Sequence, residues 1–492
     1  PDLHPTPKHR RQRKSHAGSP HGISSARSTI LAIAIAYTLF VIYGSLVPLN
    51  FQHHAWHEAV EAFKNIRYLN LGIGNRADWV ANILLYVPLA FLWFGALWHA
   101  TSAVWRIVAT LCVLLACTSL SIAIEFTQIF FPPRTVSLND IFAEIIGTVL
   151  GIALWLVIGI RITNLVRAVF QGGTAARYAV LITYVIAYTA LSLFPYDFLL
   201  TYEEWQAHLV SGKAGWFFVP SCGSGCVWKL IPEILVVAPL GILGVLAFGK
   251  THRFSLPLAA VVGMLLGVLI EGLQLTIVSG ISQGASVGSR AVGITLGVWL
   301  AQSANRVDWL RVRRFARGLL MLGMLPYLVL LAWANKWFSS NWLGVSEGME
   351  RFGNINFLPF YYHYYTSEAV ALVSMLFQAG LYLPVGAGMW LWHWAGKLGR
   401  PNCSVVWPVM IAIMLASVVE GGKLFIAGQH PDPSNILIAA FAALVAYQLL
   451  QMLLTMKPAQ TTVNAQTTVI PDQTTEQQQS EHKSGTIVRR PH

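Results

Sequence analysis

The chain carries little charge for its length. Of its 492 residues, only 11% are Asp, Glu, Lys or Arg, whereas 55% are hydrophobic. A soluble domain has charge on roughly a quarter of its residues, so the charged side chains here are too few to cover a water-facing surface. The composition therefore excludes an ordinary soluble protein.

Motifs for cofactors and for known catalytic groups are also lacking. The chain has 5 cysteines, without the spacing of Cys and His that marks a haem or zinc site. It has no phosphate-binding loop and no nucleophile motif of the Gly-x-Ser-x-Gly type. We therefore predict no metal and no cofactor, and no catalytic residue is identified. Cys222 and Cys226 lie in a predicted outer loop, where a local disulfide is a candidate.

Long apolar runs are abundant. The run "TILAIAIAYTLFVIYGSLVPL" (29–49) can cross a hydrocarbon core, which takes about 20 helical residues. The same criterion gives about twelve candidate spans. They lie near residues 30–49, 80–99, 107–130, 140–160, 178–197, 230–249, 256–279, 285–302, 318–336, 368–394, 405–427 and 433–455. The predicted fold class is an all-α integral membrane protein.

The distribution of positive charge predicts the orientation. With the N-terminus inside, 23 Lys and Arg residues lie on the cytoplasmic side and 8 on the other. Positively charged loops stay in the cytoplasm, so both termini are predicted to be cytoplasmic. The basic tail (1–28) is expected to contact anionic lipid headgroups and not nucleic acid. The polar tail (457–492) is expected to be disordered.

The chain repeats itself. Residues 124–151, "IEFTQIFFPPRTVSLNDIFAEIIGTVLG", align with residues 270–297, "IEGLQLTIVSGISQGASVGSRAVGITLG", at one offset of 146. The aligned polar pairs are Glu125 with Glu271 and Gln128 with Gln274, and upstream Asn82 aligns with Glu233. A third, weaker copy places Glu420, Lys423 and Asn435 under Glu125, Gln128 and Asp140, and Gln378 under Asn82. A fixed internal period is typical of repeat architectures.

The spacing predicts three repeats of four spans, at 29–160, 177–303 and 318–456. An even number of spans returns the chain to the same side, so the three repeats are expected to share one orientation. This differs from the inverted repeats of many transporters.

The first repeat concentrates polar residues at the outer ends of its spans. Glu125 and Gln128 are three residues apart and share a helix face. A carboxylate inside a span costs about 2.5–3.5 kcal/mol on insertion scales, so it should face protein or water. Asp140 can cap the helix that follows, since Asp is a good N-cap residue. The candidate binding residues are Asp78, Asn82, Glu125, Gln128, Arg134, Asp140 and Glu144.

A structural interpretation competes with a functional one. Arg134 can bridge to Asp140 or Glu125, and the cluster then only holds helices together. A purely structural cluster should persist in every copy, however, and the second copy has Gly280, Ser286 and Arg290 where the first has Arg134, Asp140 and Glu144. This loss favours one working site in repeat one and two scaffolding repeats. The aromatic outer segment "FLPFYYHYYTSEAV" (357–370) is predicted to lie at the level of the lipid headgroups.

Residues 78–91, "DWVANILLYVPLAF", and 124–151 resemble the VanZ-like family of membrane proteins. The matching positions are Asp78, Asn82, Pro88, Glu125, Gln128, Arg134, Ser137, Asp140 and Gly147, whereas Glu144 stands where the family has Asn. "NFLPF" (356–360) resembles a further family element in repeat three. The resemblance implies a protein of the bacterial cytoplasmic membrane, in a family linked to resistance to the glycopeptide teicoplanin.

Three functions are compatible with these residues. The first is binding of an amphipathic envelope molecule, such as a lipid-linked glycan or glycopeptide, with Arg134 holding an anionic group. The second is a transporter or flippase, and the third is an enzyme that uses Glu125 or Asp140 as an acid or base. Membrane lipids are the expected partners, and the oligomeric state is left open.

Overall fold

The computed structural model describes residues 20–68, 72, 75–98, 102–171, 173–219, 225–248, 255–304, 306–339, 341–396 and 404–455. Residues 1–19 of the basic tail and the whole polar tail (457–492) lie outside this part of the chain, and so does the expected disorder of that tail. Cys222 and the side chain of Cys226 lie outside it as well, so the candidate disulfide does too.

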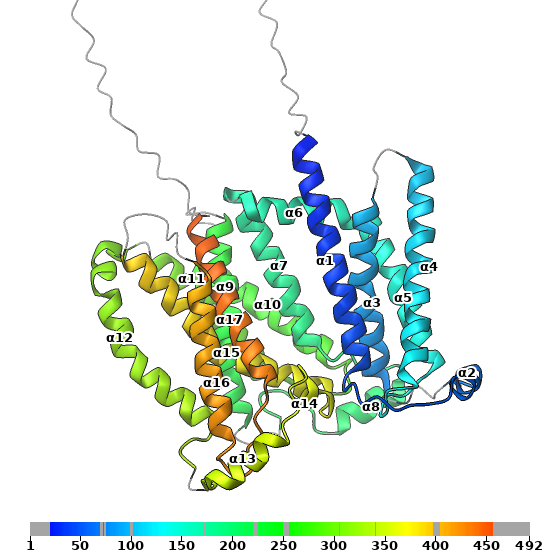
Figure 1. The fold of residues 1–492 in the computed structure, drawn as a ribbon. Coiled ribbons are helices and arrows are strands. Elements are labelled where there is room, and N and C mark those ends of the chain that lie inside the picture. Colours follow the sequence, from blue (N-terminus) through cyan, green and yellow to red (C-terminus); the bar gives the residue numbers. More distant parts are fainter. Residues whose placement is uncertain are drawn as a thin grey trace, which may run out of the picture. The chain divides into compact units, whose positions relative to one another are not determined.

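The first helix group follows the first predicted repeat. It consists of α1 (Pro20–Leu46), α3 (Arg76–Leu97), α4 (Ala103–Gln128) and α5 (Leu138–Leu154), with the short α2 (Trp56–Lys64) in the connection after α1. A π-helical turn, η2 (Trp155–Gly159), joins α5 to α6 (Ile160–Gln171). Such turns bend a helix, and α6 runs nearly perpendicular to the long helices (Figure 1).

The second and third groups each begin with one long helix, followed by short elements and then three long helices. The second contains α7 (Gly173–Leu193), α8 (Tyr202–Val210), α9 (Gly225–Phe248), α10 (Leu256–Gln274) and α11 (Gly284–Ser303), with two short paired strands, β1 (Ala214–Gly215) and β2 (Ser282–Gln283). The third contains α12 (Trp309–Ala334), α13 (Val345–Gly353), α14 (Tyr361–Tyr364), α15 (Glu368–Gly396), α16 (Val406–Lys423) and α17 (Ser434–Thr455).

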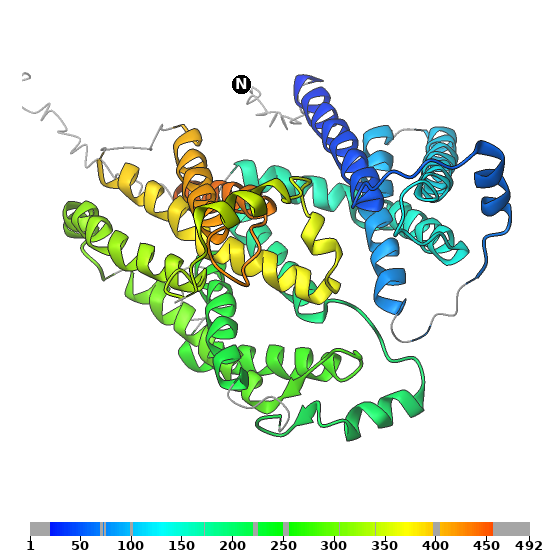
Figure 2. The same cartoon turned by 60° about the horizontal axis from the view of Figure 1, so that its bottom comes forward.

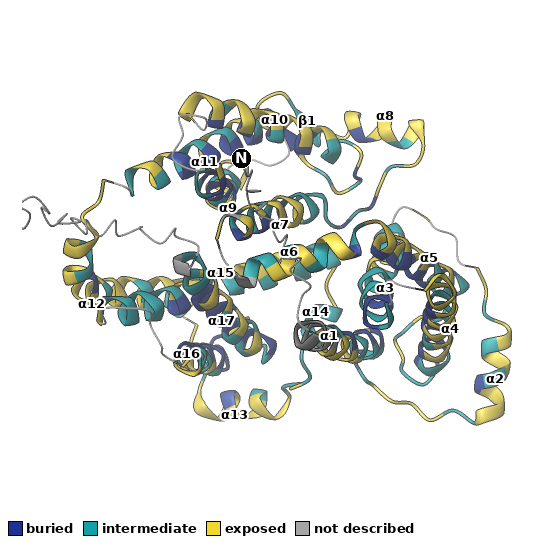
Figure 3. Cartoon of the chain, turned by 90° about the horizontal axis from the view of Figure 1, so that it is seen from above, coloured by how far each residue is buried: buried dark blue, intermediate teal, exposed yellow. Residues whose placement is uncertain are grey.

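Helix packing follows one pattern in the three groups. The last long helix packs against both preceding ones, α5 on α3 and α4, α11 on α9 and α10, and α17 on α15 and α16. Each group has its own buried hydrophobic cluster. The long helices gather into three clusters (Figures 2 and 3), and the view from above in Figure 3 shows many exposed residues on their outer faces. Exposed apolar faces suit helices surrounded by lipid.

The predicted all-α membrane fold is confirmed. Within the described residues, 11 helices are long and apolar enough to cross a membrane. The remaining predicted span, 285–302, is helical as α11 but is not one of these 11. The reason is that α11 carries Ser286, Ser289 and Arg290, which are buried among its neighbours and lower its hydropathy.

Small residues set the distance between α3 and α5. A Cβ atom added at Gly147 would lie 2.3 Å from the carbonyl oxygen of Ile83, and one at Gly151 would lie 2.3 Å from that of Val87. The Gly-x-x-x-Gly spacing therefore lets the two backbones touch, as it does between other membrane helices. This close contact brings the start of α5 beside the start of α3.

Candidate functional site

Glu125 ties the end of α4 to the start of α5. It lies in the last turn of α4, which ends at Gln128, shortly before Pro132 and Pro133. Its side chain is only 2% exposed, and its Oε2 atom accepts the backbone N–H of Ser137 at 3.1 Å. The carboxylate thus faces protein and holds the loop that leads into α5.

Ser137, and not Asp140, caps α5. Its hydroxyl oxygen accepts the backbone N–H of Asp140 at 3.2 Å, and the hydroxyl donates to Asp140 Oδ2 at 2.6 Å. Our expectation that Asp140 is the N-cap was wrong, because the helix already begins at Leu138 and places Asp140 in its first turn. The other oxygen, Oδ1, accepts a hydrogen bond from Asn82 Nδ2 at 2.7 Å. Asp140 therefore links α5 to α3.

Arg134 contacts backbone carbonyls instead of the carboxylates that we considered. Its Nε donates to the carbonyl of Ser45 at 2.7 Å, and its Nη2 donates to that of Gly44 at 2.8 Å. Gln128 Nε2 donates to the same Ser45 carbonyl at 2.9 Å. The last carbonyls of a helix lack partners within it and form the negative end of its dipole. Arg134 therefore caps the C-terminal end of α1.

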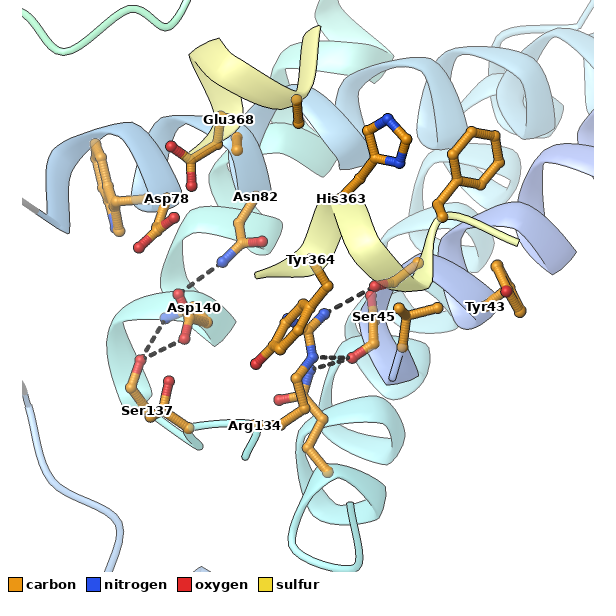
Figure 4. Close-up of a pocket in the computed structure, with 18 of the residues that line it drawn as sticks. Tyr43, Ser45, Asp78, Asn82, Arg134, Ser137, Asp140, His363, Tyr364 and Glu368 are labelled. Atoms are coloured by element: carbon orange, nitrogen blue, oxygen red, sulfur yellow. Dashed lines mark hydrogen bonds between the residues drawn. The ribbon is translucent and has the colours of Figure 1, made fainter. Parts of the chain in front are cut away.

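These residues surround one cavity of about 900 Å³. All seven candidate residues line it: Asp78, Asn82, Glu125, Gln128, Arg134, Asp140 and Glu144. Figure 4 shows the side chains of Asp78, Asn82 and Asp140 directed toward a common space, with the guanidinium of Arg134 directed toward Ser45. The polar groups of the first helix group thus converge on this cavity, although Arg134 donates to backbone carbonyls whereas Asp140 bonds to Asn82 and Ser137.

The third helix group supplies another wall of this cavity. The ring of Tyr364 lies 5.0 Å from the guanidinium carbon of Arg134, and His363 and Glu368 also line the cavity. Glu368 and Asp78 both line the cavity, and their carboxyl groups lie near each other in Figure 4. The hydroxyl of Tyr43 on α1 donates to the carbonyl of Pro359 at 2.6 Å, which fixes this segment beside the first group.

Sequence reasoning missed these contributions from the third group. We assigned the aromatic segment 357–370 to the headgroup region, and the overlapping "NFLPF" (356–360) was noted as resembling a family element but was not linked to the site. The contact joins residues more than two hundred positions apart, such as Arg134 and Tyr364. Local periodicity carries no information about contacts of that kind.

In the second group, the glutamate that aligns with Glu125 forms an ion pair. Arg290 and Glu271 are 3% and 5% exposed, and Arg290 Nη1 lies 2.5 Å from Glu271 Oε1. Gln274 Nε2 donates to the carbonyl of Ser192 at 2.9 Å, as Gln128 does to Ser45. Glu233 accepts hydrogen bonds from Ser286 and Ser289 at 3.0 and 2.6 Å.

In the third group, the aligned glutamate is paired with a different cation. Lys423 Nζ lies 2.7 Å from Glu420 Oε1, and Asn435 Nδ2 donates to the same oxygen at 2.9 Å. Gln378, the counterpart of Asn82, is 8% exposed and lies in α15. Among the described residues, no ion pair reaches Glu125, Asp140 or Glu144 in the first group.

A further ion pair joins the first two groups outside the cavity. Arg76 donates to both carboxylate oxygens of Glu204, each at 2.9 Å. This hydrogen bonding lowers the pKa of Glu204 to about 2. Bidentate hydrogen bonds between arginine and a carboxylate are among the strong ones in proteins. This pair connects α3, which contains Arg76, to α8, which contains Glu204.

Comparison with known proteins identifies one part of the chain. Residues 23–159 match the VanZ/LLP1 family model. The chain thus contains a VanZ/LLP1 domain, formed by the helix group that carries the cavity. The polar residues of the cavity, apart from those of the third group, lie within this VanZ/LLP1 domain. No curated protein and no solved structure matches the chain.

Proposed function

We propose that the cavity of the VanZ/LLP1 domain binds the headgroup of an amphipathic envelope molecule, such as a lipid-linked glycan or a glycopeptide. The observation that carries this proposal is one cavity of about 900 Å³ in which carboxylates, amides and a guanidinium meet. Binding pockets for small ligands occupy roughly 300–1,000 Å³ and place a few convergent polar groups against apolar walls.

The cavity wall also has an apolar part that suits a lipid chain. Phe40, Ala371 and Met375 line it, and Phe40 is 52% exposed on α1, a helix apolar enough to cross the membrane. A ligand whose polar head contacts Asp78, Asn82 and Asp140 can therefore extend its apolar chain along the faces of α1 and α15. This combination favours an amphiphile over a soluble molecule.

The charge distribution supports a location for this site. We propose that the protein lies in the bacterial cytoplasmic membrane with both termini in the cytoplasm. The loops around the cavity, including the segment of Arg134, then face outward, where envelope lipids and glycopeptides are found. We propose that the second and third helix groups are repeats of the first that act as scaffold, since internal ion pairs occupy their equivalent spaces.

Native mass spectrometry of the purified chain tests this function. Asp78→Asn with Glu368→Gln changes two side chains that line the cavity in the first turns of their helices. We expect a bound amphiphile with the wild type and its loss from this double variant. The matched control is Glu347→Gln, an exposed acid in the first turn of α13. An identical bound mass in all three proteins, or none in the wild type, contradicts the proposal.

The resistance phenotype implied by the family is tested separately. If the site acts on glycopeptides, a host that expresses the wild type should tolerate more teicoplanin than one that expresses the double variant at equal membrane abundance. Equal tolerance would remove glycopeptides from the proposal and leave the lipid-linked ligands.

A further inference from the structure

One buried glutamate occurs in the same setting in each helix group. Glu125, Glu271 and Glu420 are 2%, 5% and 4% exposed. Each accepts the backbone N–H of the residue twelve positions further on, with distances of 3.1, 2.6 and 2.8 Å. The three carboxylates are therefore held alike by the loop that precedes the last helix of their group.

The partner of the other carboxylate oxygen, Oε1, differs between the helix groups. In the second group, Oε1 of Glu271 contacts Arg290, and in the third, Oε1 of Glu420 contacts Lys423. A buried carboxylate is costly unless it is paired with a cation and hydrogen-bonded. Both groups meet that requirement with a cation of their own chain.

The first group has no cation at either of these positions. The position aligned with Arg290 is Glu144, and the position aligned with Lys423 is Gln128. Gln128 is 7% exposed and lines the cavity, and its Oε1 atom has no hydrogen-bond partner within the described residues. Where the third group has the ammonium of Lys423, the first group therefore has the amide oxygen of Gln128, unpaired among the described residues, three residues from Glu125.

The whole cavity has an excess of acids. Its wall carries the five carboxyl groups of Asp78, Glu125, Asp140, Glu144 and Glu368. Arg134 is the cation of the first group on that wall, and it donates to two backbone carbonyls. An anionic group would meet repulsion from these carboxylates, whereas a cationic group would be attracted.

We propose, on the basis of the binding function above, that the ligand carries a positively charged amino group. This group occupies the place beside Glu125 that Arg290 and Lys423 fill in the other two helix groups, and it donates to Glu125 and to Oε1 of Gln128. The source is either an aminolipid headgroup or an amino sugar, which share this chemistry.

Binding to the purified full chain tests the amino group. The probes are phosphatidylethanolamine, its N-acetylated derivative and phosphatidylglycerol in detergent micelles, measured by native mass spectrometry. A second arm compares glucosamine with N-acetylglucosamine. A charge-assisted hydrogen bond changes affinity by at least about tenfold, so we expect the free amine to bind at least about tenfold more tightly than its acetylated partner in one arm.

Gln128→Lys then supplies the missing internal cation. It copies the pairing of Lys423 with Glu420, and we expect it to remove the preference for the free amine. Gln206→Lys, at an exposed position of α8, is the matched control and should keep the preference. If Gln128→Lys does not fold, Glu125→Gln serves instead, because its amide oxygen can still accept the Ser137 N–H while its charge is gone.

The outcomes separate the two proposals. Equal binding of free and acetylated amine to the wild type refutes the proposal that the ligand carries an amino group, but leaves the binding function standing. The Glu125 carboxyl would then be neutralised by a proton and not by a cation of the ligand. A preference that survives both Gln128→Lys and Glu125→Gln also refutes that proposal. If no amphiphile binds the wild type, the proposed function fails and the amino group fails with it. The arm in which the preference appears identifies the lipid or the sugar as its source.

Discussion

Removal of Arg290 should damage the second helix group far more than removal of its whole ion pair. The guanidinium contacts Glu271 at 2.5 Å, the Tyr188 hydroxyl at 2.9 Å and the Ser286 carbonyl at 3.0 Å. Arg290→Met keeps much of the volume but leaves Glu271 buried and charged. Breaking a buried pair in this way costs about 3–5 kcal/mol.

The double variant Arg290→Met with Glu271→Gln removes both charges. The glutamine oxygen can still accept the Gln283 N–H, which donates to Glu271 at 2.6 Å in the wild type. Replacing a buried pair by neutral groups of similar volume is often nearly neutral, so we expect the double variant to recover most of the lost stability.

Thermal unfolding in detergent measures this difference. The melting temperatures of the wild type, Arg290→Met and the double variant are compared under one set of conditions, with size-exclusion profiles to check the folded state. A double variant as unstable as the single variant would refute the reasoning, because the loss would then come from packing around Arg290. An unchanged melting temperature of Arg290→Met would show that the buried ion pair does not stabilise the second helix group.

Three further predictions concern the architecture around the cavity. Gly151→Val places a Cβ 2.3 Å from a carbonyl of α3 and should lower the melting temperature through a loss of about 1–3 kcal/mol or more, whereas Gly318→Ala, in open space on α12, should not. Ser137→Ala removes the N-cap of α5 and should cost about 1 kcal/mol in thermal unfolding; no change would show that Asp140 takes over. The pKa of Glu204 is lowered from 4.5 to about 2 by Arg76, so the stability lost in Glu204→Gln should be largest above pH 4.5 and vanish as the pH falls toward 2. A pH-independent difference in melting temperature would contradict that origin.

Sequence patterns predicted the convergence of the first helix group well. Glu125 and Gln128 share a face because they are three residues apart on one helix, and both line the cavity. The Gly-x-x-x-Gly spacing of α5 lets this helix pack closely on α3. Asn82 Nδ2 then lies 2.7 Å from Asp140 Oδ1. The partners of these residues were harder to predict. Arg134 had several acceptors at a comparable separation along the chain, and the carbonyls at the end of α1 were not among those considered.

The amino-acid sequence alone determined that this chain is a helical membrane protein, because runs of about 20 apolar residues have one stable arrangement in a bilayer. It also indicated that acids of the first helix group face protein. The i, i+3 spacing of Glu420 and Lys423 also indicated their ion pair. Only the tertiary structure decided that Tyr364 and Glu368 complete the cavity, and that Arg290 pairs with Glu271 in the second group. Helix formation depends on residues a few positions apart, whereas these contacts depend on how separate helices pack, and a linear pattern does not encode that packing.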